Sequence, residues 1–362
     1  MKNKSYDVSE QRRASSMMNA RWGIPVALLI SLATALAGEV QPLMVQRGAS
    51  WLDESFSGSL DTNIWKVAIG AWKIEQGTLV GTERPEDHHP AVIKTPFTNI
   101  TAVVQFSFML KGDARLHFGL NDAGGHNSSI QIRPDAVIMN KNADRKNPRT
   151  YAPILDETGA ALAPDIWHTM IVELNGEEIL ARVDDTVFVC GAHPGINKVK
   201  TDLALAVSGA ALFRNVKLWH ATPSTDWPAE KSKLLARQAA RPVLDRSANP
   251  ADAYQAAEMK ARDRLMKSDE KFVALVDVRA CAMEALAKAF PVVNRKGEKA
   301  DAEKKRLAQE DAKYKQLQKT VQTAQKNERD YLLAQSPEAR TAWAALLAAS
   351  QAKAKAAAAA KK

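Results

Sequence analysis

Polar side chains on three predicted strands could together bind a ligand. In residues 114–120, 129–133 and 101–110, apolar and polar side chains alternate, so one face of each strand should enter the core and the other should point away from it. If the three strands are neighbours, their outward side chains form one polar, cationic patch: Gln105, Arg115, His117, Gln131 and Arg133. Guanidinium and amide groups make paired hydrogen bonds to hydroxyls and carboxylates, so the patch suits a sugar. The alternative is the ordinary solvent-facing side of an antiparallel sheet.

Glu173 is the one carboxylate that we nominate as a general acid or base. It lies on the polar face of its predicted strand, residues 168–174. Its alternative role is a cross-strand salt bridge. Cleavage of a glycosidic bond usually requires two carboxylates about 5–10 Å apart, and no second carboxylate at a recognisable spacing accompanies Glu173.

The sequence predicts no cofactor, and metal binding enters as one minor hypothesis. Asp184 and Asp185 mark a turn between strands, where calcium is the alternative to a purely structural role. No glycine-rich phosphate loop and no Cys-x-x-Cys pair occurs, so nucleotide-dependent and zinc-ribbon functions have no support. Cys190 and Cys281 could form a disulfide or remain separate thiols.

Short strands must position these residues. Between about residues 50 and 221, apolar residues recur with period two in runs separated by Gly, Pro, Asn and Asp, which predicts a mainly β, antiparallel domain. Asn175-Gly176 lies between two such runs and predicts a tight hairpin turn. The expected strands, which imply a two-sheet sandwich or a barrel, are residues 72–76, 91–95, 101–110, 114–120, 129–133, 136–141, 168–174, 178–184, 186–190, 202–207 and 212–219.

The remainder of the chain predicts helices. We expect a linker over residues 222–230 and a separate α-helical region over 231–349. An apolar face over residues 269–290 predicts one helix, which Pro291 ends.

A longer helix is expected over residues 299–335, where Leu307, Tyr314 and Val321 recur every seven residues like a coiled-coil seam. Glu310 and Glu328 interrupt this seam and favour an antiparallel helical hairpin over a parallel dimer. Ser336-Pro337 should open a short last helix through Leu347, and the Ala- and Lys-rich residues 350–362 should be a disordered tail.

The net charge of +9 over 362 residues is unevenly distributed. Residues 1–37 hold five basic and two acidic residues, residues 38–230 hold 17 and 23, and residues 231–362 hold 28 and 16. The basic helical tail could hold the protein to anionic cell-envelope polymers through a salt-dependent attraction. The alternative is that Lys and Glu at helical spacings form ordinary solvated helix faces.

Residues 24–37 have the properties of a signal-peptide core. The stretch is uncharged, follows three arginines, is too short to span a bilayer comfortably, and ends in Ala-Leu-Ala, which predicts cleavage after Ala37. An uncleaved membrane anchor is the alternative. We expect the chain from Gly38 to be secreted or periplasmic and not integral to the membrane; Met17 or Met18 would give a more usual signal length than Met1.

Three motifs occur in the order in which a known family has them. They are WKIEQGTLVG (residues 72–81), IWH followed by IVELNG (residues 166–176) and FRNVKLW (residues 213–219). They resemble the concanavalin A-like lectin and glucanase superfamily, and most of all its bacterial keto-disaccharide hydrolase-type domains. The resemblance covers about residues 51–221 and implies a jelly roll of two curved sheets, a saccharide on the concave face, and export.

One strand departs from that family. The hydrolase-like branch has a strand resembling Glu-x-Gln-Ile-x-Asp, whereas residues 129–134 read SIQIRP. The Glu-x-Asp-x-x-Glu strand of retaining glucanases is absent from residues 51–221. The sequence therefore favours a secreted, lectin-like glycan-binding protein. A glycoside or keto-sugar hydrolase that uses Glu173 is the alternative, and a structural envelope protein without a small ligand is the third hypothesis.

Overall fold

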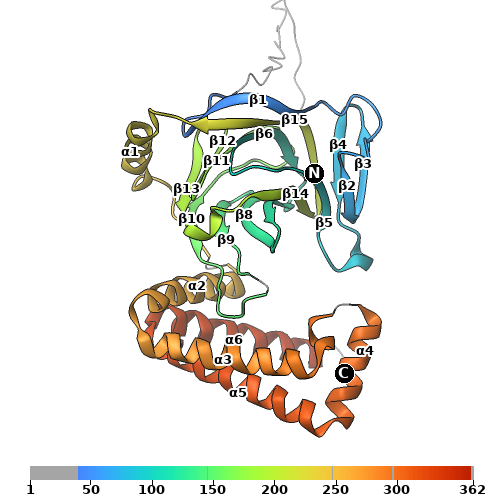
Figure 1. The fold of residues 1–362 in the computed structure, drawn as a ribbon, viewed down its shortest axis with the longest axis vertical. Helices are drawn as coiled ribbons and strands as arrows, with labels where there is room; N and C mark the ends of the chain where they lie inside the picture. The colour runs from blue at the N-terminus through green and yellow to red at the C-terminus, as the bar shows by residue number, and fades with distance from the viewer. Residues whose placement is uncertain (1–39, 145, 247, 296, 360–362) are drawn as a thin grey trace, which may run out of the picture. The chain divides into compact units, whose positions relative to one another are not determined.

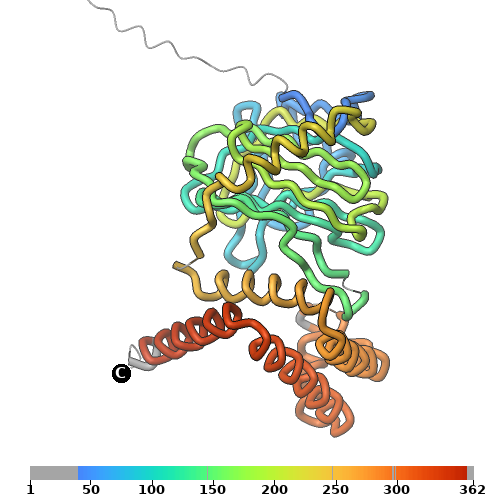
Figure 2. The backbone as a smooth tube through the Cα atoms, turned by 90° about the vertical axis from the view of Figure 1, so that its left-hand side faces the viewer, coloured from blue at the N-terminus to red at the C-terminus, as the bar shows by residue number. Residues whose placement is uncertain are grey.

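The computed structural model describes residues 40–359 except 145, 247 and 296 (Figure 1). The predicted signal peptide, residues 1–37, lies outside the described residues. The described chain forms two antiparallel β-sheets that face each other, followed by helices (Figures 1 and 2). This confirms the prediction of a two-sheet, jelly-roll-like sandwich with a helical region after it. Among the described residues, no helix has both the length and the apolar composition that a membrane span requires.

The strands divide into two sheets. Sheet A has, in spatial order, β13 (Val187–Ala192), β12 (Glu178–Val183), β11 (His168–Asn175), β6 (Thr101–Leu110), β15 (Ala210–Pro223), β4 (Thr78–Thr82) and β3 (Ala71–Glu75), and β1 (Val45–Glu54) also pairs with β15. Sheet B has β10 (Ile154–Gly159), β9 (Ala136–Lys141), β8 (Gly125–Arg133), β7 (Arg115–Asp122), β14 (Lys200–Ser208), β5 (Ala91–Pro96) and β2 (Lys66–Ile69). Short 3-10 turns occur at Pro85–Asp87, Pro194–Ile196 and Pro291–Asn294.

Each of the eleven predicted strands is present, with ends that shift by a few residues. The predicted hairpin is confirmed: Asn175 pairs with Glu178 across β11 and β12, and Gly176 supplies the positive φ of +59° that the turn requires. The alternation missed β1, β2, β4 and β10. In β1 the reason is visible, because register shifts at two places break its period-two pattern.

Aromatic side chains join the two sheets. Phe106 of sheet A stacks on Phe118 of sheet B with ring centroids 5.8 Å apart, and Phe108 and Phe213 are buried in the same core. Burial of such rings contributes most of the hydrophobic stabilisation of a sandwich.

The outer face of sheet A is covered as well. Val103, Ile171, Leu180 and Trp219 point away from the main core and pack with a second apolar cluster that contains Met44. Helix α1 (Trp227–Gln238) contributes its two buried residues to the same cluster. The first helix therefore packs on the sandwich, and the residues expected to form a linker, 222–230, are the end of β15 and the start of α1.

The other helices lie on the side of sheet B. They are α2 (Pro250–Ser268), α3 (Glu270–Ala289), α4 (Glu298–Glu310), α5 (Ala312–Gln335) and α6 (Pro337–Ala359). Helix α3 packs along α5 and α2 packs along α6, and both views show α2 between the sandwich and the remaining helices (Figures 1 and 2). The helix expected over residues 269–290 is α3.

Two helix predictions need correction. The long helix over residues 299–335 is interrupted at Asp311, whose backbone is extended and whose side chain accepts a hydrogen bond from the N–H of Tyr314 as the N-cap of α5. The seven-residue pattern continues across this break and conceals it. Helix α6 continues to Ala359, so residues 350–359 are helical rather than disordered.

Candidate functional site

The structure brings four of the five predicted ligand-binding residues onto one face. Strands β7 and β8 are neighbours in sheet B, and His117 pairs with Gln131 across them. Arg115 and Arg133 lie at the ends of the same two strands. The residues that alternate with them are in the core between the sheets. All four therefore lie on the outer face of sheet B, which points away from sheet A.

Gln105 does not belong to this face, because β6 lies in sheet A. Its side chain is buried, and its Oε1 accepts hydrogen bonds from the N–H of Val40 at 3.0 Å and from Arg47 at 3.0 Å. The expectation that all three strands are neighbours is therefore wrong for β6. Alternation indicates which side of its own sheet a residue occupies, but not to which sheet the strand belongs.

Glu173 is not a catalytic carboxylate but an anchor for the N-terminal segment. It lies on the covered outer face of sheet A with 0% exposure, and its Oε2 accepts hydrogen bonds from the N–H groups of Leu43 at 2.8 Å, Met44 at 2.5 Å and Val45 at 3.3 Å. Its Oε1 lies 3.4 Å from Arg182. Burial raises the pKa of Glu173 above its ordinary value, against these hydrogen bonds and the Arg182 charge. No substrate reaches a carboxylate so enclosed, and the general acid-base assignment is wrong.

Arg133 fixes helix α2 in place and is not open to a ligand. Only 7% of its surface is exposed, and its guanidinium pairs with Asp135 at 3.0 Å and with Asp252 of α2 at 3.0 Å. Asp252 also pairs with Arg246 at 2.8 Å. Together these pairs neutralise Arg133 and fix the start of α2 over one end of the sheet. Arg115 remains exposed.

Pairing across sheet B arranges its outward residues in rows. The first row holds Val92, Ala206, His117, Gln131 and Ile138. The second row holds Lys94, Ala204, Gly119, Ser129 and Asn140. The third row holds Asp202 and Asn121. We call these three rows the sheet B face.

Small residues form the middle of the sheet B face. Gly119 lies between Ala204 and Ser129 in the second row, with His117 and Asn121 on either side along β7. A Cβ atom added at Gly119 would meet only Ala204, with its closest atom at 3.5 Å, which is an ordinary contact. Gly119 also has no positive φ that would demand glycine. Space therefore lies directly above the backbone here, between longer polar side chains.

The polar groups around these small residues are mostly uncharged. Burial and the charge of Arg115 lower the pKa of His117, so its imidazole is neutral near pH 7 and offers one donor and one acceptor. The Nε2 atoms of His117 and Gln131 lie 3.4 Å apart. Asp202 is paired with Lys94 at 3.2 Å and accepts a hydrogen bond from Asn121. The face therefore presents hydrogen-bonding groups without a strong net charge.

The turn at Asp184 and Asp185 is structural. Asp184 binds His168 Nδ1 at 2.6 Å and the N–H of Thr169 at 2.7 Å, while Asp185 binds Arg182 at 2.5 Å. Within the described part of the chain, no group of three or more His, Cys, Asp or Glu side chains could hold a metal ion. Cys190 and Cys281 are both free thiols, and burial raises the pKa of Cys190 to about 11.

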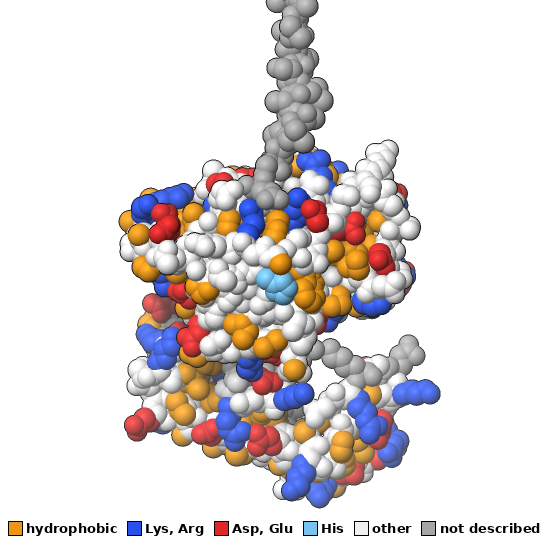
Figure 3. Space-filling model, turned by 45° about the horizontal axis from the view of Figure 1, so that its top comes forward, with side chains coloured by type: hydrophobic (Ala, Val, Ile, Leu, Met, Phe, Trp, Pro, Cys, Tyr) orange, Lys and Arg blue, Asp and Glu red, His pale blue; other side chains and the backbone are white. Residues whose placement is uncertain are grey.

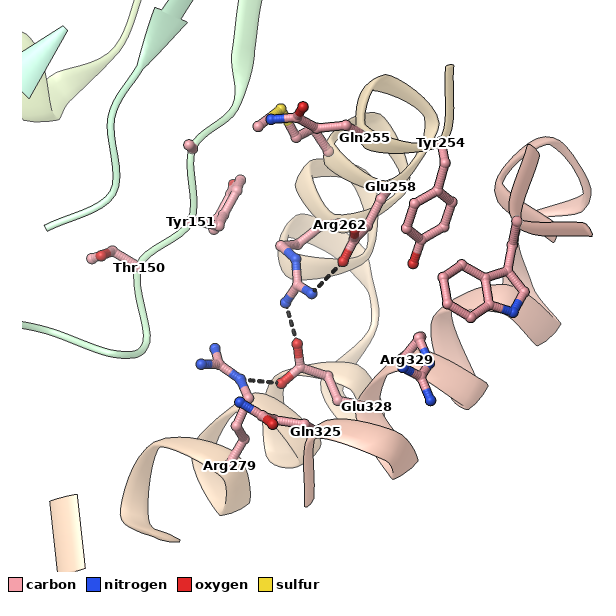
Figure 4. A pocket seen from close by; sticks show the side chains of 13 residues that line it. Thr150, Tyr151, Tyr254, Gln255, Glu258, Arg262, Arg279, Gln325, Glu328 and Arg329 are labelled. Atoms are coloured by element: carbon pink, nitrogen blue, oxygen red, sulfur yellow. Dashed lines mark hydrogen bonds and ion pairs between the residues drawn. The ribbon is translucent and has the colours of Figure 1, made fainter. Parts of the chain in front are cut away.

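A pocket of about 610 Å³, which the sequence did not indicate, lies beside α2 (Figure 4). The connection between β9 and β10 lines it with Tyr151, and helices α2, α3, α5 and α6 supply the other side chains. At its centre is Glu328, which is 2% exposed and lies between Arg262 and Arg279. In the sequence, Glu328 interrupted the apolar seam; a charged residue at a core position is the signal that could have indicated this pocket.

Charges of both signs are interspersed on the face of the molecule shown in Figure 3, including the helical part. Several helix lysines and arginines pair with acidic residues one turn away, among them Lys267 with Asp263 and Lys326 with Asp330. Such pairs are typical of solvated helix faces, and binding of the basic helices to anionic polymers stays a prediction.

No family model matches this chain, and no curated protein matches its sequence. Solved structures with similar folds include the carbohydrate-binding module CBM66 from Bacillus subtilis, at 14% identity and a TM-score of 0.34 over 43% of this chain and 97% of that one. A β-glucanase from Bacillus licheniformis has 13% identity and a TM-score of 0.38, over 48% and 99%. A Bacillus subtilis protein with a galectin-like fold has 10% identity and a TM-score of 0.39, over 50% and 100%. At these scores the likenesses carry no argument about what this chain does.

Proposed function

We propose that this protein binds carbohydrate through the sheet B face. The observation that carries the proposal is the space above Gly119, which lies between the small Ala204 and Ser129 in the second row and between the polar His117 and Asn121 along β7. A sugar ring needs such close approach, because its hydroxyl groups lie around the rim of a flat, uncharged body.

The chemistry of the surrounding groups supports a neutral, hydroxyl-rich ligand. The amide of Gln131 and the neutral imidazole of His117 can each donate and accept, which matches hydroxyl groups that do both. Ser129 and Asn140 add two further uncharged groups in the same row as Gly119. Asp202 and Lys94 are already paired with each other, so the sheet B face offers a charged ligand no unpaired partner among these two.

Binding is favoured over bond cleavage. Hydrolysis of a glycosidic bond usually uses two carboxylates on opposite sides of that bond. Among the described residues of the sheet B face, the carboxylate is Asp202, which is paired with Lys94 and bonded to Asn121, and Glu173 lies on the other sheet. A keto-sugar or glycoside hydrolase activity is therefore an outcome to be measured rather than the function proposed.

Filling the space above Gly119 should abolish glycan binding without unfolding the protein. A glycan array first identifies a ligand for the wild-type protein, and titration calorimetry then compares Gly119→Leu, Gln131→Ala and His117→Ala. We expect no measurable binding for Gly119→Leu. We expect about two- to tenfold weaker binding for each of the other two, the range for losing a neutral hydrogen bond.

The matched control is Gln46→Ala, an exposed glutamine on β1 of sheet A, which should bind as the wild type does. Unchanged affinity in Gly119→Leu, with an unchanged melting temperature, would contradict the proposal. Hydrolysis of a sugar by the wild type would instead support the hydrolase alternative.

We also propose that the protein is exported and cleaved after Ala37. The uncharged, signal-like stretch over residues 24–37, which ends in Ala-Leu-Ala, supports this. N-terminal sequencing of the secreted or periplasmic protein should yield Gly38 first. A mature chain that retains Met1 or Met17 would contradict cleavage.

A further inference from the structure

The pocket beside α2 is lined by none of the residues of the sheet B face and has its own chemistry, although Gln255 and Met259 also line a small neighbouring cavity that reaches Gln131. Its volume of about 610 Å³ is within the range of small-molecule sites and is large enough for one or two sugar rings. Figure 4 shows Arg262, Glu328 and Arg279 meeting at the centre of the pocket, with Tyr151 of the β9–β10 connection beside them.

Hydrogen bonds and ion pairs hold the connection between β9 and β10 against the helices. The hydroxyl group of Tyr151 donates to Asp263 of α2 at 2.8 Å, and Arg279 of α3 donates to the carbonyl oxygen of Pro148 at 2.8 Å. Arg149 pairs with Asp277 at 2.9 Å and with Glu284 at 2.5 Å. The two sides of the pocket are thus fixed to each other before any ligand binds, which lowers the entropic cost of binding.

The central charges neutralise one another. Glu328 receives hydrogen bonds from Arg262 on one oxygen and from Arg279 on the other, the latter at 2.5 Å, and Arg262 also pairs with Glu258 at 3.2 Å. Two arginines and two glutamates therefore leave the centre of the pocket without net charge. Their packing fixes the side chains that a ligand would meet.

Arg329 adds a positive charge that these carboxylates do not neutralise. Among the described acidic residues, Asp330 is the one that pairs with it, at 3.9 Å and on an exposed side chain. The Nε of Arg329 is buried and has no hydrogen-bond partner within the described chain. Its guanidinium group lies 5.1 Å from the ring centroid of Trp343, which in turn contacts Tyr254 with centroids 4.8 Å apart.

We propose that this pocket binds an acidic sugar, with its ring along the aromatic pair of Tyr254 and Trp343 and its carboxylate on Arg329. A carboxylate matches a guanidinium in geometry and charge. Aromatic rings offer the apolar surface that the carbon-bound hydrogens of a sugar ring prefer, and Gln255 and Gln325 line the pocket with amides that can bind its hydroxyl groups.

Titration calorimetry with glucuronic acid, glucose and acetate as probes tests this proposal. The wild type should bind glucuronate more tightly than either glucose or acetate, because only glucuronate has both the ring and the charge. Arg329→Gln should weaken glucuronate binding about ten- to a hundredfold, the range for a charge-assisted hydrogen bond, and should leave glucose binding unchanged. Arg340→Gln, an exposed arginine on α6, is the matched control and should bind as the wild type does.

Three results would overturn the inference: no glucuronate binding by the wild type, unchanged affinity in Arg329→Gln, or acetate binding as tightly as glucuronate. If Arg329→Gln fails to fold, Gln325→Trp places a ring in the pocket from an exposed position on α5 and should also weaken glucuronate binding. Gln131→Ala should leave glucuronate binding intact, so failure at the sheet B face and failure at this pocket are distinguishable.

Discussion

Replacing Glu173 with alanine should lower the free energy of unfolding by about 3–5 kcal/mol, the cost of removing one partner from a buried ion pair. The change leaves the buried N–H groups of Met44 and Val45 and the part-buried N–H group of Leu43 without their acceptor, and it leaves the guanidinium of Arg182 beside an empty space. Urea denaturation followed by circular dichroism measures the loss.

The control for this prediction is Glu75→Ala. Glu75 also belongs to a sheet A strand, but its side chain is 53% exposed and, among the described residues, its salt-bridge partner is the exposed Lys73, so its loss should change stability by less than about 0.5 kcal/mol. A loss in Glu173→Ala that is no larger than this would mean that the N-terminal segment is not held through Glu173.

The pH dependence of stability provides a second measurement at Glu173. Because burial raises its pKa in the folded state above the ordinary value, the folded protein binds this proton more tightly than the unfolded chain does. The stability that this group contributes is therefore present below about pH 4.5, the ordinary pKa of this glutamate in the unfolded chain, and is lost as the pH rises through the raised pKa. Glu173→Gln should lack this loss, and denaturation at several pH values between about 4 and 7 tests it.

Asp156→Ala should also destabilise the protein by about 3–5 kcal/mol, because it leaves a buried arginine without its partner. Asp156 is 8% exposed and binds Arg241 through both oxygens, at 2.8 and 2.7 Å. One of these oxygens also accepts from the N–H of Cys190 at 2.8 Å. This group of bonds ties the chain just after α1 to the edges of both sheets.

A double-mutant cycle separates the interaction between Asp156 and Arg241 from the effects of each single change. Asp156→Ala combined with Arg241→Met should lose less stability than the sum of the two single changes, because no uncompensated charge remains. Glu310→Ala, which breaks an exposed i,i+4 pair with Arg306 on α4, is the control and should cost about 0.3–0.5 kcal/mol. Additive losses would show that Asp156 and Arg241 act independently.

Much of the sandwich could be predicted from local pattern alone. Alternation over residues such as 115–120 assigns inward and outward sides correctly, since Leu116 and Phe118 are in the core and His117 is not. The hairpin at Gly176 follows from a turn that requires a positive φ. Helix α3 follows from its apolar face and from the proline after it. These features depend on residues close together in the chain.

The candidate site was only partly predictable, because its residues are selected by contacts between distant segments. His117, Gln131, Gln105 and Glu173 are all polar residues on the outward side of their strands, and nothing local distinguishes them. The tertiary structure places the first two on sheet B and covers the other two with residues 40–47. Arg133 likewise looks exposed until Asp252, 119 residues away, binds it.

The sequence by itself determined eleven of the strands, their two sides, helix α3 and the start of α6, because hydrophobic periodicity and turn chemistry act over a few residues. Only the tertiary structure decided which strands share a sheet, which outward face is covered and that Glu328 lies at the centre of a pocket. The physical reason is that covering an outer face depends on segments that arrive from far along the chain, and their docking follows from shape and charge complementarity that no local pattern encodes.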